Sequence, residues 1–127
     1  MDMNEYVHET TMKVRDYECD LQGIVNNANY QHYLEHARHE FLLSRHISFA
    51  ELHEKGIDAV VSGITMRFKC PLKSGDEFVV KTGYVHDGFK YIFRQDIYRL
   101  SDMKLSVKGV VDTVCVVDGK LSNIDLL

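Results

Sequence analysis

The residues best placed for chemistry are a lone carboxylate, Asp20, and the backbone around Asn27, where a helix is expected to begin. No other charged side chain occurs in residues 19–31. The first turn of a helix has unpaired N–H groups and a partial positive charge, which polarise a carbonyl oxygen or stabilise an oxyanion. Losing one such donor costs roughly 3–4 kcal/mol of barrier. A carboxylate nearby can then act as general base on water, or as nucleophile through an anhydride.

Simpler interpretations of this loop stay open from the residues alone. Asp20 fits equally well as a solvated carboxylate or a turn former, and Gly23 lets the backbone bend sharply before the helix. Cys19 offers a thiol beside Asp20, but no histidine is adjacent in sequence to activate it, which favours a packing role.

Three histidines, His32, His36 and His39, share one face of the expected helix. The first two have the i, i+4 spacing that can bind zinc. Because the chain has no HExxH motif and no evident third ligand, a polar helix face is favoured. We therefore expect neither a metal nor a cofactor.

The periodicity of the chain predicts an α+β fold. Apolar residues at i, i+3, i+4, i+7 and i+11, starting at Tyr30, predict one long helix. Ser48 and Gly56 are expected to bound a short second helix. Alternating patterns predict strands, and Asp87-Gly88 and Asp118-Gly119 predict turns between strands. The expected ranges are 28–45 for the long helix and 10–17, 59–69, 77–86, 90–99 and 105–117 for five strands of an antiparallel sheet wrapped around it.

Composition bounds the class of protein. The 127 residues suit one domain, residues 1–127, and 45% apolar with 27% charged residues argues against disorder. A net charge of -4 without a basic block makes nucleic acid a poor expectation. The polar N-terminus lacks the features of a signal peptide, and no apolar run is long enough to span a membrane, so a cytoplasmic location is expected. Three cysteines without a CxxC pair do not suggest disulfides.

Residues 14–30, VRDYECDLQGIVNNANY, resemble the signature of the 4-hydroxybenzoyl-CoA thioesterase family of hotdog proteins. That signature is an acidic residue, x, Asp, x, x, Gly, an aliphatic residue, Val, four further positions and Tyr, and it opens the central helix. Residues 33–38, YLEHAR, resemble the continuation of that helix, and residues 70–76, CPLKSGD, resemble the segment after the next strand. The resemblance covers nearly the whole chain and includes the strand order.

This resemblance implies a hotdog fold and hydrolysis of acyl thioesters, with sites shared across a homodimer or homotetramer. Asp20 falls on the family's catalytic carboxylate, Asn27 on its oxyanion donor and Gly23 on the glycine between them. The substrate-binding candidates implied by the same matches are Val25, Tyr30 and Glu35. The VNNxxY run is closer to acyl carrier protein (ACP) thioesterases, including plant ones, than to bacterial CoA enzymes, so the carrier is CoA or ACP.

Arg67 and Lys69, together with Lys73, form a small basic cluster near Pro71. A solvated strand face is one interpretation, and contact with the phosphates of a pantetheine carrier or with acidic ACP is the other. Two other functions are weighed against hydrolysis: a hotdog hydratase or dehydratase, and a non-catalytic acyl-binding module. The first normally pairs an acid with a histidine on the opposite segment, and no His-rich loop followed by Pro-Gly appears in this chain. An intact Asp20 with its Gly23 argues against the second.

Overall fold

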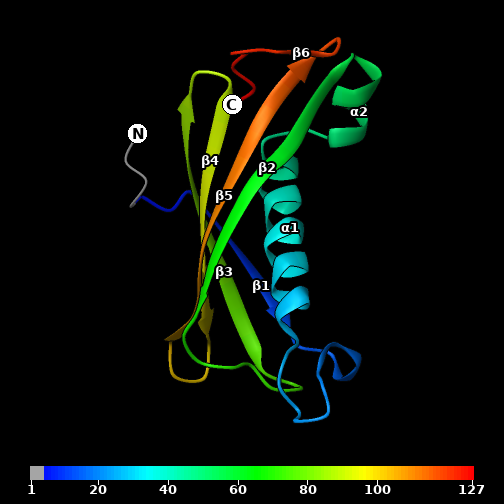
Figure 1. Cartoon of the computed structure of the whole chain (residues 1–127). Helices are drawn as coiled ribbons and strands as arrows, with labels where there is room; N and C mark the ends of the chain where they lie inside the picture. The colour runs from blue at the N-terminus through cyan, green and yellow to red at the C-terminus, as the bar shows by residue number, and fades with distance from the viewer. Residues whose placement is uncertain (1–4) are drawn as a thin grey trace.

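The computed structural model describes residues 5–127. An antiparallel sheet curls along one long helix, α1, and a short helix, α2, lies at one end (Figure 1). The strand order is β1-β3-β4-β5-β2, and β6 pairs with β5. The elements are β1 (His8–Lys13), a 3-10 helix (Asp16–Glu18), α1 (Asn27–Ser44), α2 (Phe49–Glu54), β2 (Ile57–Phe68), β3 (Glu77–Asp87), β4 (Lys90–Arg99), β5 (Lys104–Val117) and β6 (Lys120–Leu121).

The core lies between one face of the sheet and α1. Along β5, alternate residues are buried because successive side chains of a strand point to opposite faces. α1 packs closely against the sheet at Gly109 on β5. A Cβ atom added to this glycine would lie 2.9 Å from Leu34 Cδ1 and 2.8 Å from Gln95 O, which is too close for a side chain. From α1 the buried residues are Tyr30, Tyr33, Leu34, Ala37, Arg38, Phe41 and Leu42. The buried apolar stripe predicted from Tyr30 onward is therefore confirmed.

One predicted strand is wrong in its extent. The chain leaves the sheet after Lys13, and Asp16–Glu18 form a 3-10 helix instead of continuing the strand to residue 17. The alternating apolar pattern predicts a longer strand. The chain instead turns at residues 16–18, where the Glu18 side chain accepts a hydrogen bond from the Arg15 N–H at 2.8 Å. The other predicted elements lie within about two residues of those observed. A sixth strand, β6, adds two residues to the five predicted strands.

Both predicted turns are present. Asp118 (φ 49°) and Gly119 (φ 83°) connect β5 to β6, and both have the positive φ that this hairpin turn requires. Between β3 and β4 the two central residues are Gly88 and Phe89, one position later than the predicted pair. Within residues 5–127, neither helix is long and apolar enough to cross a bilayer. Residues 1–4, part of the N-terminal segment judged not to be a signal peptide, lie outside the described range.

Candidate active site

The loop that carries Asp20 is a small hairpin fastened to the start of α1. Cys19 forms an antiparallel bridge with Val25, and the Asp20 N–H donates to Ile24 O at 2.9 Å. The turn closes through Gly23, whose N–H donates to Asp20 O at 3.0 Å. Gly23 has φ 81°, a conformation that strains any residue with a Cβ, so this glycine is required by the backbone.

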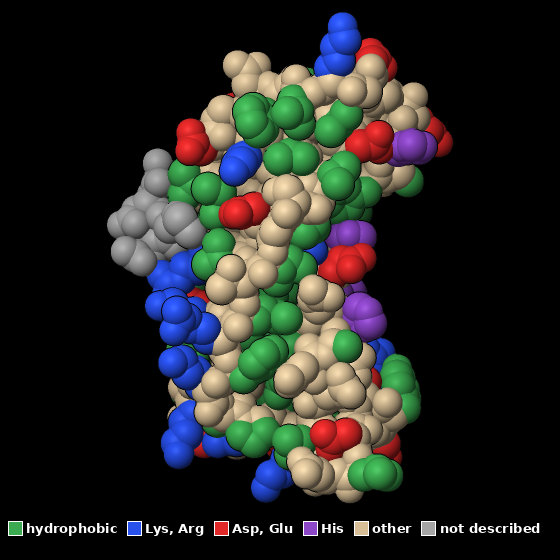
Figure 2. Space-filling view, viewed as in Figure 1, with side chains coloured by type: hydrophobic (Ala, Val, Ile, Leu, Met, Phe, Trp, Pro, Cys, Tyr) green, Lys and Arg blue, Asp and Glu red, His purple; other side chains and the backbone are tan. Residues whose placement is uncertain are grey.

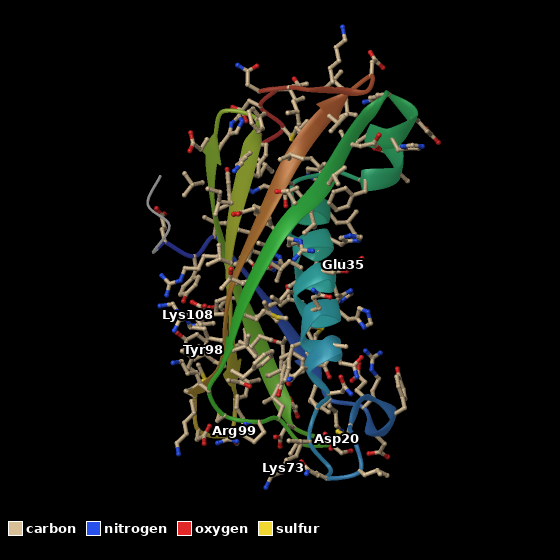
Figure 3. The ribbon with its side chains drawn as sticks, viewed as in Figure 1. Asp20, Glu35, Lys73, Tyr98, Arg99 and Lys108 are labelled. Carbon is tan, nitrogen blue, oxygen red and sulfur yellow. The ribbon has the colours of Figure 1, made fainter. Side chains whose placement is uncertain are left out.

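The Asp20 side chain is exposed at the end of the molecule where α1 begins (Figure 3). Its Oδ1 accepts a hydrogen bond from the Gln22 N–H at 2.8 Å, which is the turn-forming role weighed from the sequence. Asp20 lines neither of the two principal hollows of the chain. A reactant that meets this carboxylate must therefore approach from the surface or from a second subunit.

The start of α1 has the free N–H group that the sequence predicts. Asn26 is the N-cap, and its Oδ1 accepts from the Ala28 N–H at 2.9 Å. The Asn29 N–H donates to Asn26 O at 2.9 Å. The exposed Asn27 N–H, in contrast, makes no hydrogen bond to any residue in 5–127, so it is available to an incoming oxygen.

Glu18 holds this loop against α1, a role that the sequence analysis missed. Its carboxylate is buried and accepts from the Tyr33 hydroxyl at 2.9 Å, from the Arg15 N–H at 2.8 Å and from Arg15 Nη2 at 3.1 Å. Its carbonyl oxygen accepts from the Asn26 N–H at 3.1 Å and from Asn29 Nδ2 at 2.8 Å. Burial by itself raises the pKa of Glu18, but the bonds from Arg15 and Tyr33 outweigh burial and lower it.

Val25 and Tyr30 couple the helix start to the segment that follows β2. Both are buried, and the Val25 N–H donates to Leu72 O at 2.9 Å. The Tyr30 hydroxyl accepts from the Leu72 N–H at 3.0 Å, and its ring lies 5.5 Å from that of Phe68. Burial raises the pKa of Tyr30, so this phenol stays protonated. In one chain these two residues pack beside the loop and are covered by other side chains.

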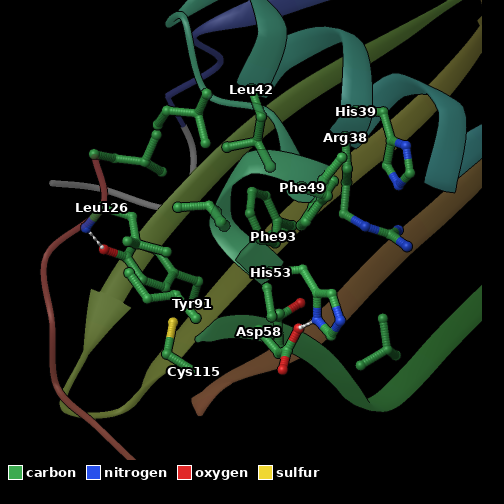
Figure 4. A pocket seen from close by; sticks show the side chains of 18 of the residues that line it. Arg38, His39, Leu42, Phe49, His53, Asp58, Tyr91, Phe93, Cys115 and Leu126 are labelled. Carbon is green, nitrogen blue, oxygen red and sulfur yellow. Dashed lines mark hydrogen bonds and ion pairs between the residues drawn. The ribbon is translucent and has the colours of Figure 1, made fainter. Parts of the chain in front are cut away.

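An apolar hollow lies at the other half of α1, between α1, α2, β2 and the chain's C-terminal end (Figure 4). Its volume is about 570 Å³, within the range of small-molecule pockets. Glu35 is among the residues that line it. Glu35 lies eight residues beyond Asn27, or about 12 Å along the helix axis. One chain therefore does not bring Glu35 together with Asp20.

Several polar groups border this apolar hollow. Arg38 is buried, and its Nη1 donates to Gln95 Oε1 at 2.9 Å while Gln95 Nε2 donates to Leu34 O at 2.9 Å. Burial lowers the pKa of Arg38 and that of His39. His53 Nδ1 lies 2.7 Å from Asp58 Oδ1 at the rim, as Figure 4 shows.

The remaining candidates lie away from the loop or are inert. Arg67 and Lys69 are exposed at one end of β2, with Arg67 on the sheet face opposite α1. Burial, followed by the charges of Asp16 and Asp20, raises the pKa of the Cys19 thiol and keeps it protonated, which disfavours a thiolate nucleophile. Residues 5–127 hold no cluster of three potential metal ligands.

The curled sheet with its lengthwise helix is the hotdog fold, as solved structures confirm. The crystal structure of Slr0204, a 1,4-dihydroxy-2-naphthoyl-CoA thioesterase from Synechocystis, superposes with a TM-score of 0.87. The match covers 92% of this chain and 88% of that one at 16% identity, a level that establishes the fold alone.

Residues 14–125 match the model of the thioesterase-like superfamily, and the chain belongs to that family. The acyl-acyl carrier protein thioesterase ATL3 of Arabidopsis thaliana is 52% identical over 79 residues, which are 62% of this chain. The putative acyl-CoA thioesterase YneP of Bacillus subtilis is 31% identical over 87% of this chain and 80% of its own length. This chain spans 41% of the length of ATL3.

Proposed function

We propose that this protein hydrolyses acyl thioesters, releasing a free carboxylic acid and a thiol. The observation that supports the proposal is the fastened hairpin of residues 19–25, which carries Asp20 and leads into a helix whose first N–H, that of Asn27, makes no hydrogen bond within residues 5–127. These are the two groups that thioester hydrolysis needs: a base or nucleophile, and a donor for the oxyanion. The thioesterase names of its relatives support the same reaction.

In the proposed reaction, the thioester carbonyl oxygen lies against the Asn27 N–H. Asp20 takes a proton from water as the water oxygen bonds to the carbonyl carbon, and negative charge builds on the carbonyl oxygen. Collapse of this intermediate breaks the C–S bond, and the thiolate recovers a proton. Asp20 acting as nucleophile would form an anhydride that water then opens. In either route Gly23 shapes the turn and Glu18 holds the loop.

The acyl group needs a cavity, and we propose that a second copy of the chain supplies it. β2 is an edge strand, paired only with β5 within residues 5–127. Val60 and Val61 near its middle are 48% and 42% exposed, and residues 59–66 carry no charge. Hydrophobic side chains run along the face that β2 crosses (Figure 2). An exposed, uncharged edge of this kind favours pairing with another strand.

A symmetric pair joined antiparallel along β2 would make composite sites. Identical strands that pair about a two-fold axis run in opposite directions, so the Phe68 end of one lies beside the Ile57 end of the other. Phe68 packs on Tyr30 near the start of α1, whereas Ile57 lines the 570 Å³ hollow. The loop of one subunit would then face the hollow of its partner. This arrangement would give Glu35 a place near Asp20 that it lacks in one chain.

Hydrolysis is tested by following thiol release from acyl-CoA and acyl-ACP substrates of increasing chain length. We expect Asp20→Asn to lower kcat by about 10²-fold or more, because the amide accepts no proton. Asp87→Asn, at an exposed strand end, is the matched control and should retain full activity. Activity of Asp20→Asn equal to that of the wild type would exclude the proposed role. Tight acyl-thioester binding without turnover by the wild type would instead indicate a binding module.

The composite site is tested by placing a charge in the β2 edge. Val61→Asp should shift the protein from dimer or tetramer to monomer in analytical ultracentrifugation and abolish thiol release. The matched control Leu121→Asp places the same charge on an exposed apolar residue of β6, which pairs with β5 and is not part of the β2 edge, so it should leave assembly and thiol release unchanged. A monomeric wild type with full activity would rule out the shared site.

A cytoplasmic location and a single domain over residues 1–127 are part of the same proposal. The three cysteines within the described residues are free thiols, which suits a reducing compartment. The Arabidopsis relative is named as chloroplastic, so the compartment can differ between organisms.

A further inference from the structure

Five exposed cations lie around the end of the sheet next to the Asp20 loop. We call this set the basic strip, and it combines residues of β2, β5 and the segment between β2 and β3. Figure 2 shows Lys and Arg side chains gathered on one flank of the molecule, and Figure 3 places Lys108 on that flank and Lys73 at the end of the molecule near Asp20. The basic strip consists of Arg67, Lys69, Lys73, Lys104 and Lys108.

The register of the sheet brings two of these charges face to face. Arg67 lies directly opposite Lys108 in the β2–β5 pair, and their side chains share the face that turns away from α1. Like charges at directly opposite positions destabilise a sheet. Lys108 is also opposite Asp96 on β4, but Asp96 is buried and already accepts hydrogen bonds from Tyr6 and from Arg94, the latter at 2.8 Å. Lys108 forms no ion pair with that carboxylate.

The basic strip has no ion pair within residues 5–127. Arg99, which lies opposite Lys104, is not part of the strip because its charge is paired. Its Nε donates to Asp102 Oδ1 at 3.0 Å. The chain as a whole carries a net charge of -4. Five unpaired cations on one flank of an acidic protein make a local positive field, which attracts an acidic partner.

The shape of the strip favours a macromolecule over a small anion. Its side chains are exposed, three on strands and two on the segment between β2 and β3, and none of the five lines either principal hollow. Small phosphorylated ligands are usually held in concave sites with converging donors. From Lys104 to Lys108 the strip runs about 14 Å along β5. A flat, elongated cationic surface instead complements an acidic protein surface.

The strip also leads to the proposed site. Lys73 forms a backbone bridge with Ile24, and Ile24 O accepts from the Asp20 N–H. A protein seated on the strip would thus lie beside the loop. We infer that the basic strip docks an acidic acyl carrier protein, whose acylated phosphopantetheine arm reaches the Asp20 loop. This inference rests on the proposed function and adds the carrier to it.

The test compares one acyl group on two carriers. The charge-reversal variant Lys104→Glu/Lys108→Glu should lower the ratio of kcat/KM for acyl-ACP to kcat/KM for acyl-CoA by about tenfold, mainly through KM. The carboxylate introduced by Lys108→Glu would face Arg67 on one neighbouring strand and Asp96 on the other, so urea denaturation is used to verify that the variant is folded before the rates are compared. The matched control Lys90→Glu/Lys120→Glu makes the same change in net charge on β4 and β6, away from the β2 edge, and should keep the wild-type ratio.

Two results would overturn the inference. An unchanged ratio with both rates intact would show that the strip is not used, and equal losses on both carriers would assign it to the phosphates of CoA. Binding of holo-ACP, which carries no acyl group, is measured in parallel by fluorescence anisotropy. It should weaken as ionic strength rises and the Debye length falls from ~30 Å at about 0.01 M to ~8 Å at about 0.15 M. This binding assay does not depend on hydrolysis. Salt-sensitive binding of holo-ACP without any thioester turnover would therefore reject the proposed function and leave the docking inference standing.

Discussion

Replacing Tyr33 with phenylalanine removes a single hydroxyl from the interior contact that holds the Asp20 loop. Tyr33 is 2% exposed, Glu18 is 6% exposed, and the hydroxyl donates to Glu18 Oε1 at 2.9 Å. A hydrogen bond to a buried charged group contributes about 1.5–3 kcal/mol. The Glu18 carboxylate keeps its two donors from Arg15, so we expect a loss in the free energy of unfolding at the lower end, about 1.5–2 kcal/mol.

The same substitution should change the pH dependence of stability. Because the folded state lowers the pKa of Glu18, its contribution is present above the unfolded pKa, about 4.3, and is lost as pH falls through the folded value. The Tyr33 hydroxyl is one of the causes of that lowering, so Tyr33→Phe should lose less stability on acidification than the wild type. Urea denaturation at neutral pH and at several acidic pH values measures both effects.

Activity should respond more than stability, since the Glu18 backbone also binds the start of α1. A loop displaced by a fraction of an ångström can cost on the order of tenfold or more in rate, so kcat for thiol release should fall while the protein remains folded. Tyr17→Phe is the matched control, because Tyr17 lies in the same segment but is 77% exposed. Unchanged unfolding free energy and unchanged kcat in Tyr33→Phe would refute the idea that Glu18 fastens the loop.

Three further substitutions test the elements around the site. Gly109→Ala places a Cβ too close to Gln95 O and Leu34 Cδ1, so we expect it to destabilise by about 1–3 kcal/mol in urea denaturation; a neutral result would mean that the helix can move away from the sheet. Asn26→Ala removes the N-cap and should cost about 1 kcal/mol, whereas Asn26→Gly should cost only a few tenths. Gly23→Ala meets no steric obstacle but must adopt φ 81°, so it should lose about 1–2 kcal/mol and part of its activity; retention of both would contradict the strain argument.

Much of the fold could be predicted because its signals are local. The helix stripe starting at Tyr30, the alternation of β5 and the glycines that end strands each depend on side chains a few residues apart. The capping role of Asn26 follows from side-chain chemistry in the same way. The candidate residues of the loop were found by family resemblance, since Asp20 alone is also an ordinary turn former and the structure shows it bonded as one.

Other features required the tertiary structure, because they depend on residues that are distant in sequence. The burial of Glu18 needs Tyr33, fifteen positions away, and nothing in the local pattern sets this acid apart from Asp16 two residues earlier. The opposition of Arg67 and Lys108 depends on strand register across the sheet, and that register is set by which side chains pack under α1. The sequence by itself determined the long helix, the four long strands that follow it and the approximate positions of the turns. Packing between the elements decided which charges are buried, which face each other and which remain free for a partner, because those properties arise from nonlocal contacts.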